Sequence, residues 1–308
     1  MKKYFKHPSI YILALLPLFA SLSCTKDIDV PEPEFDVVAN KTKVAVNEPI
    51  TFNFTGSADL ISFYSGEKGK EYRFRERSKV DGKPQMKFNS LRQYGLNTTA
   101  VDQTLKVLVS TDFKGIYDLP TITSATWTDI STRGTLSNGP ATATVFVPSG
   151  NIDLSDLYTP GVPFYLAFRY ENATGVQSQR TWTINSLAID SKLPDGSLVS
   201  VATVADLTWG SVNVSGAQVW TFNATQIQMA GGTGANPTNE DWLITKPLLL
   251  DNVQRDYGVN VKGNPIVKPT SYEYIFKTPG TYTVTFEAIN ANKWDQKTII
   301  KEFTITVQ

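Results

Sequence analysis

The chain has 308 residues, and its 29 lysines and arginines balance 29 aspartates and glutamates. Its only histidine, His7, and its only cysteine, Cys24, both lie near the N-terminus. The rest of the sequence therefore excludes nucleophile–histidine triads, cysteine–histidine dyads and zinc sites made of histidine and cysteine. It also lacks the basic excess that attracts nucleic acid, so we expect no nucleic-acid partner.

Residues 1–23 are predicted to form a lipoprotein signal peptide. Three lysines accompany an apolar stretch, residues 10–22, that is too short for a convincing membrane-spanning helix. The small residues Ser21 and Ser23 stand just before Cys24, as at a signal-peptidase site. We expect Cys24 to carry a diacylglyceryl thioether that anchors the chain in a membrane. The alternative is secretion with a free N-terminal thiol, because a lone cysteine forms no disulfide within its chain.

Residues 24–34 are predicted to form a tether between the lipid and the folded part. Pro31 and Pro33 alternate with Glu32 and Glu34, a composition that does not fold alone. The segment resembles the acidic export stretch of Bacteroidetes surface lipoproteins. That resemblance implies an outer-membrane protein that faces the cell exterior.

Alternation of apolar and polar residues predicts β-strands through the rest of the chain. It is clearest in residues 50–54, 105–109, 164–170, 282–288 and 303–307. Turn signals such as Asp81-Gly82 and Pro279-Gly280 separate such segments, and no sustained helical periodicity occurs. The predicted class is all-β, with sandwiches or jelly rolls as the natural architectures.

Two families resemble different parts of this pattern. Residues 46–54 with 62–66 look like the opening half of a PKD-like Ig sandwich, and residues 272–284 look like its closing half. Five central segments follow the order of a choice-of-anchor or adhesin-like jelly roll; they are residues 102–112, 127–130, 149–155, 164–170 and 182–189. Residues 241–247 resemble a stretch that comes first in that family, but here it comes last.

The resemblances predict a split PKD-like domain, residues 35–75 and 251–308. A permuted jelly-roll domain, residues 76–250, is inserted into it. The alternative is two β-sandwiches in series. As a whole, the mature chain resembles an uncharacterised family of Bacteroidetes surface lipoproteins, a domain of unknown function. That resemblance implies a setting beside a Sus-type nutrient-uptake system, with a TonB-dependent importer and its lid lipoprotein as partners.

Aromatic side chains are the candidate ligand-binding groups, because flat sugar faces stack on tryptophan and tyrosine. Trp209, Trp220, Trp294 and Tyr158 lie near glycine, asparagine or proline rather than inside the strongest apolar alternations. We predict that at least one of them is a glycan-stacking platform, and weigh this against ordinary packing. Three other tryptophans are assigned to the core: Trp182, Trp242 and, less clearly, Trp127.

Acidic residues close in sequence raise the question of catalysis. Glycoside hydrolysis needs two carboxylates that flank the cleaved bond. The candidate pairs are Asp153 with Asp156, Glu240 with Asp241, and Asp251 with Asp256. Turn capping and solvation explain them more simply, so we predict no catalytic residue. A calcium clamp from Asp190, Glu240 or Asp241 has no supporting Asp-x-Asp-x-Asp-Gly spacing, and we predict no metal and no cofactor.

Six cations between residues 68 and 79 alternate with three glutamates, which predicts a solvated edge strand. Residues 229–237 are glycine-rich but lack the lysine of a phosphate loop. The function that this sequence favours is a non-catalytic surface lipoprotein that binds glycan and assists nutrient uptake. The alternative is a protein-binding or adhesive cell-surface module.

Overall fold

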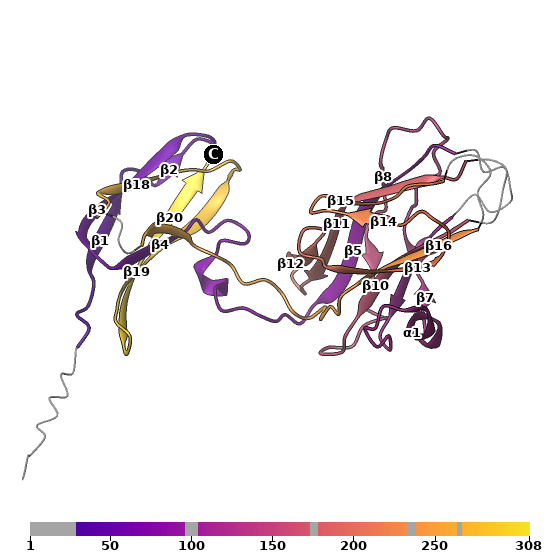
Figure 1. Cartoon of the computed structure of the whole chain (residues 1–308). Helices are drawn as coiled ribbons and strands as arrows, with labels where there is room; N and C mark the ends of the chain where they lie inside the picture. The colour runs from indigo at the N-terminus through magenta and orange to yellow at the C-terminus, as the bar shows by residue number, and fades with distance from the viewer. Residues whose placement is uncertain (1–28, 96–103, 173–177, 233–237, 264–266) are drawn as a thin grey trace, which may run out of the picture.

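The computed structural model describes residues 29–95, 104–172, 178–232, 238–263 and 267–308. Strands dominate, and the described residues contain a single α-helix, α1 (Leu119–Ser124). The predicted all-β class is therefore confirmed. The strands form two bodies connected by extended segments (Figure 1). In the part of the chain that is described, no helix is long and apolar enough to cross a membrane.

The first body, here called the terminal sandwich, consists of two sheets. One has the order β1-β3-β18 and the other the order β17-β4-β19-β20-β2. Their strands are β1 (Glu34–Ala39), β2 (Lys43–Val44), β3 (Pro49–Ser57), β4 (Leu60–Tyr64), β17 (Val259–Lys262), β18 (Ser271–Ile275), β19 (Gly280–Ala291) and β20 (Gln296–Val307).

Strands from both ends of the chain build this body. In the first sheet Phe52 pairs with Tyr272, and in the second Phe63 pairs with Phe286. The apolar residues of both sheets face inward and form one buried core, which includes Ile50. Neither end of the chain can bury its apolar face without the other. A split sandwich requires its two chain ends to pair in this way. The domain limits at residues 75 and 251 stay a prediction.

The second body, here called the central sandwich, also has two sheets. One has the order β13-β16-β10-β6-β7; the other has the order β14-β15-β11-β5-β8, with β12 and β9 added to β11 and β5. The strands are β5 (Lys83–Gln93), β6 (Leu105–Ser110), β7 (Thr128–Asp129), β8 (Val147–Pro148), β9 (Ile152–Asp153), β10 (Tyr165–Asn172), β11 (Thr181–Lys192), β12 (Leu198–Thr203), β13 (Trp209–Ser215), β14 (Trp220–Phe222), β15 (Gln226–Met229) and β16 (Asn239–Thr245).

The central sandwich has a main core between its sheets and a second apolar layer outside one of them. Trp182 lies in the main core, where its Nε1 donates to Thr104 Oγ1 at 2.9 Å. Helix α1 and the segment around Phe113 cover the outer face of β10 and β16, and Trp242 is buried there. The core assignment of both tryptophans is confirmed. Trp127 packs against the outer layer and is half-buried.

Two segments connect the sandwiches and are hydrogen-bonded to each other. Val80 N donates to Asp251 O, and Val253 N donates to Ser78 O, each at 3.0 Å. An isolated bridge joins Lys79 to Asn252. The two connections therefore run side by side, as Figure 1 also shows.

The basic cluster does not form the predicted edge strand. Residues Tyr72–Phe74 form a 3-10 turn, η1, at the start of one connection. The guanidinium of Arg75 lies 3.9 Å from the ring centre of Tyr72, and that of Arg77 lies 3.9 Å from Phe74. Arg77 Nη2 also lies 3.1 Å from an oxygen of buried Asp256. These cations are held by aromatic faces and by a buried carboxylate. The alternation of charges in the sequence does not reveal such partners.

Candidate functional site

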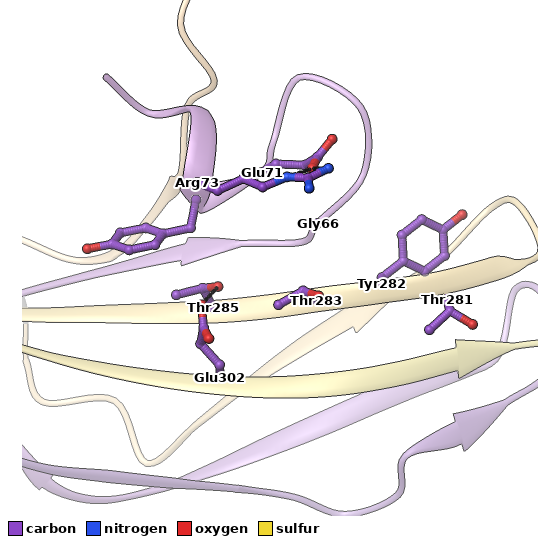
Figure 2. Close-up of a pocket in the computed structure, with 9 residues that line it drawn as sticks. Gly66, Glu71, Arg73, Thr281, Tyr282, Thr283, Thr285 and Glu302 are labelled. Atoms are coloured by element: carbon purple, nitrogen blue, oxygen red, sulfur yellow. Dashed lines mark hydrogen bonds and ion pairs between the residues drawn. The ribbon is translucent and has the colours of Figure 1, made fainter. Parts of the chain in front are cut away.

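A groove of about 400 Å³ lies on the outer face of the terminal sandwich. It is bounded by strands β19 and β20 on one side and by the loop after β4 on the other (Figure 2). We call it the threonine groove. Its lining residues are Gly66, Glu71, Tyr72, Arg73, Thr281, Tyr282, Thr283, Thr285 and Glu302.

The strand geometry of β19 places its threonines in the groove. Successive side chains of a strand point to opposite faces, and Val284 and Phe286 point into the core. Thr281, Thr283 and Thr285 therefore lie on the outer face, where Thr281 and Thr283 are exposed and Thr285 is buried. The register pairs Thr285 with Glu302 of β20, and Thr285 Oγ1 donates to Glu302 Oε1 at 3.2 Å.

A glycine allows the loop after β4 to approach this row. Gly66 has φ of +76°, which favours glycine, and a Cβ atom there would lie 2.5 Å from the carbonyl oxygen of Thr283. Gly66 N donates to Lys70 O at 3.0 Å and closes the loop. The loop thereby becomes the wall of the groove opposite the strands.

Charged and phenolic groups complete the lining. Arg73 Nε donates to Glu71 Oε2 at 2.6 Å on the loop side. Tyr72 Oη donates to Glu287 Oε1 at 3.2 Å. Burial, together with the negative charge of Glu287, raises the pKa of Tyr72 to about 12, so its hydroxyl remains protonated at neutral pH. The groove thus offers hydroxyl, carboxylate and guanidinium groups in a shallow row, which suits a ligand rich in hydroxyls.

A family model described as a domain of unknown function, DUF5017, matches residues 23–209, which is more than half of the chain. The chain belongs to the DUF5017 family. The expectation of a family of unknown function is confirmed, whereas the lipoprotein setting stays a prediction. No curated protein and no solved structure matches this chain. Within the groove, the match includes Gly66, Glu71 and Arg73 but ends before strands β19 and β20.

Two of the predicted stacking residues of this DUF5017 protein lie in the core. Trp209 in β13 is 8% exposed, and Trp220 in β14 is 4% exposed. Their ring centres lie 6.1 and 6.3 Å from that of Phe168. Neighbouring glycine and serine suggested looser positions, but the opposite sheet covers both rings. We correct their assignment to core residues, because a sugar cannot reach them in the folded protein.

The other two candidates are more accessible but lie in different sandwiches. Trp294 is 67% exposed in the turn between β19 and β20, with Lys293 Nζ 3.9 Å from its ring centre. Tyr158 packs partly against the core of the central sandwich. Burial raises the pKa of Tyr158, and the charge of Asp251 adds to this effect. Neither residue lines the threonine groove, and their stacking role stays a prediction. Cys24 lies outside the described residues.

Alanine substitution should separate the core tryptophan from the exposed one. Trp209→Ala should lower the free energy of unfolding by about 3–5 kcal/mol, because it leaves a cavity between the sheets. Trp294→Ala should change it by no more than about 0.5 kcal/mol, because its ring is exposed. Chemical denaturation followed by circular dichroism measures both. Equal destabilisation by the two substitutions would contradict these locations.

The acidic pairs predicted from sequence have structural partners. Asp156 accepts from Arg133 Nη1 and Nη2 at 2.6 and 2.8 Å. Lys79 Nζ lies 3.3 Å from Asp251 Oδ2, and Asp256 pairs with Arg77 as described above. Within the described residues, no group of three or more acidic, histidine or cysteine side chains could hold a metal ion.

Glu240 and Asp241 point to opposite faces of their sheet. Glu240 accepts from Arg169 Nε at 2.8 Å on the outer side. Asp241 shares the inner face with Leu243 and is buried there. Burial, with a further contribution from the charge of Glu240, raises the pKa of Asp241 to about 7. In the orientation that satisfies both ends of its amide, Asn239 donates to Asp241 Oδ2 at 2.9 Å.

The raised pKa of Asp241 predicts a pH-dependent stability. The unfolded chain has an Asp241 pKa of about 3.9, so the folded protein binds this proton more tightly. The resulting stabilisation is complete below pH ~4 and is lost as pH rises through about 7. Between pH 5 and 8 the parent should lose stability on the order of 2 kcal/mol relative to Asp241→Asn. Denaturation curves of both proteins at four pH values test this, and a constant difference between them would refute it.

Sequence reasoning missed the threonine groove. The threonine-rich outer face of residues 281–285 was visible as an alternation, but nothing in it marks a binding site. Glu71 and Glu302 come from opposite ends of the sequence, and their meeting depends on the pairing of the two chain ends.

Proposed function

We propose that this DUF5017 protein is a non-catalytic surface lipoprotein that binds glycan in the threonine groove. The observation that carries the proposal is that the exposed threonines Thr281 and Thr283 line the same groove as the Glu71–Arg73 ion pair. Sugar hydroxyls both donate and accept hydrogen bonds, and these side chains supply both kinds of partner along one line. A hydroxyl-rich chain can therefore lie along β19 and contact the loop side at the same time.

Binding accounts for the groove more simply than catalysis does. Its two carboxylates are already engaged: Glu71 accepts from Arg73, and Glu302 accepts from Thr285. A carboxylate that already accepts hydrogen bonds from the protein is held in one orientation, which suits the positioning of a ligand. The carboxylates are thus suited to orienting hydroxyl groups.

A glycan array, followed by titration of the best ligand, tests the function. Thr283→Val removes one hydroxyl from the groove at nearly constant shape and should weaken binding about fivefold, the effect of one hydrogen bond. Thr298→Val is the matched control, because Thr298 is also an exposed threonine of the β19–β20 hairpin but does not line the groove. Equal affinities of the two variants would place the glycan elsewhere, and an array without any ligand would defeat the proposal.

We further propose that Cys24 carries a lipid that holds the protein on the outer membrane, facing the cell exterior. The acidic, proline-containing residues 24–34 would then separate the membrane from the terminal sandwich. A neighbouring TonB-dependent importer with its lid lipoprotein would be the partner that receives the bound glycan. Cys24→Ala should move the protein from the membrane fraction to the soluble fraction or block its processing; unchanged fractionation would refute the anchor.

The second candidate function is protein binding or adhesion, and the position of Trp294 favours it. The β19–β20 hairpin projects beyond the paired end of β4 and carries this exposed ring at its turn. Large aromatic side chains are common energetic anchors of protein interfaces. If this function holds, Trp294→Ala should abolish partner binding while Thr283→Val leaves it intact.

A further inference from the structure

A second and larger groove, of about 580 Å³, lies between the two sandwiches. Its walls are the η1 segment, the connection that contains residues 254–257, and the turn between β11 and β12. We call it the linker groove. We propose that it binds a carboxylate-bearing sugar unit, so that the ligand of this protein is an acidic oligosaccharide. This inference rests on the proposed glycan-binding function and names the class of glycan.

The carboxylates of the linker groove are already engaged with protein groups. Asp256 pairs with Arg77 at 3.1 Å and accepts from the backbone N of Glu71 at 2.9 Å. Asp195 accepts from the backbone N and the hydroxyl of Ser197, at 2.8 and 2.7 Å. Glu71 itself accepts from Arg73. Arg77 and Arg73 therefore neutralise the charges of Asp256 and Glu71, whereas Asp195 is hydrogen-bonded to neutral groups and keeps its negative charge.

Two cations of the groove lack such a partner. Lys68 and Arg255 line it, both are exposed, and neither forms an ion pair with a carboxylate in the described part of the chain. Arg77 also lines the groove, but it is paired with Asp256. The lining thus has four positive side chains against three negative ones, Glu71, Asp195 and Asp256, which leaves an excess of one positive charge. An anionic ligand would correct this imbalance, because guanidinium and ammonium groups bind carboxylates through charge-assisted hydrogen bonds.

The remaining lining residues favour a sugar as the part of the ligand that carries the negative charge. The guanidinium of Arg255 lies 5.5 Å from the ring centre of Tyr257, which is 57% exposed. A uronate unit can present its carboxylate to Arg255 and its C–H face to a ring of this kind. Leu198 and Val199 supply apolar surface from the central sandwich. Two free cations are too few for a polyanion such as nucleic acid, which requires an extended basic field.

The two grooves share a wall. Glu71 and Arg73 line both of them, so the ion pair between these residues stands at their junction. A ligand that leaves the threonine groove past Arg73 enters the linker groove. An oligosaccharide, rather than a single sugar, can therefore occupy both, with neutral hydroxyls along β19 and an acidic unit between the sandwiches.

The test compares a galacturonate hexasaccharide with the same hexasaccharide after reduction of its carboxylates, titrated into the purified protein by calorimetry. The parent should bind the acidic form at least about tenfold more tightly, and the difference should shrink as salt increases. A Lys68→Gln/Arg255→Gln double variant should lose this preference and keep its affinity for the reduced form. A Lys87→Gln/Lys114→Gln variant removes the same charge from exposed sites outside both grooves and should behave as the parent.

The outcomes separate this inference from the proposed function. Equal binding of the two hexasaccharides by the parent, or an undiminished preference in the Lys68→Gln/Arg255→Gln variant, overturns the acidic ligand and leaves glycan binding standing. Loss of affinity for both forms in Thr283→Val supports the function independently of charge. If neither hexasaccharide binds the parent, the acidic-ligand inference fails. The glycan array then tests separately whether the protein binds any glycan.

Discussion

Phe286→Ala should lower the free energy of unfolding of the terminal sandwich by about 3–5 kcal/mol. Phe286 is fully buried, and its ring centre lies 5.0 Å from those of Phe52 and Phe63 and 5.4 Å from that of Phe54. These rings come from both sheets, so the substitution leaves a cavity where the sheets meet. Because the neighbouring rings are themselves closely packed, the cavity can collapse only partly.

Thermal and chemical unfolding, with tyrosine and tryptophan signals recorded separately, measures this effect. Ile300→Ala is the control: it removes a large apolar side chain from the same hairpin, but Ile300 is 36% exposed. The control should cost less than half as much as Phe286→Ala. Trp182, Trp209 and Trp220 report on the central sandwich, which should unfold as in the parent. Similar costs for the two substitutions would mean that Phe286 is not at the centre of the core.

Removal of residues 251–308 should unfold the terminal sandwich and leave the central sandwich folded. The deletion takes away β17, β18, β19 and β20. Strand β3 then keeps only β1, and β4 loses both of its partners. Ile50, Phe52 and Phe63 would be exposed to water, and two or three strands without a covering sheet are not stable alone.

Limited proteolysis with mass spectrometry tests this result. In the shortened chain, cleavage should appear within residues 34–64, whereas strands β5 to β16 should resist as they do in the full chain. The full chain, digested under the same conditions, is the control. Protease resistance of residues 34–64 without residues 251–308 would instead support two independent sandwiches in series.

The alternation of apolar and polar residues was enough to predict many of the strands and, in the terminal sandwich, their inward faces. Within residues 282–288, Val284, Phe286 and Ala288 are buried and Thr283 is exposed as expected, although Thr285 on the outer face is buried too. This succeeds because the two-residue period of a strand is a local property that the side chains report directly. The lack of histidine after His7 likewise restricts the available chemistry through composition alone.

Local patterns were less reliable where a third layer or a distant segment intervened. Strand β10 is buried on both faces, because α1 and its neighbours cover the side that would otherwise meet water. Trp209 and Trp220 were misplaced because adjacent glycine or asparagine does not reveal which sheet will cover a ring. The cations of residues 73–77 were predicted on a strand, but Tyr72, Phe74 and distant Asp256 hold them in a connection between the sandwiches.

The positions of the two grooves follow from long-range contacts that are visible only in the folded protein. The threonine groove requires the loop after β4 to meet β19 and β20, which follow more than 200 residues later in the chain. The linker groove requires the η1 segment to meet both the second connection and the β11–β12 turn. These contacts between distant segments depend on which strands pair over long sequence separations. That choice is made by the shared burial of Ile50, Phe63 and Phe286 in one core, a cooperative property that no short stretch of sequence contains.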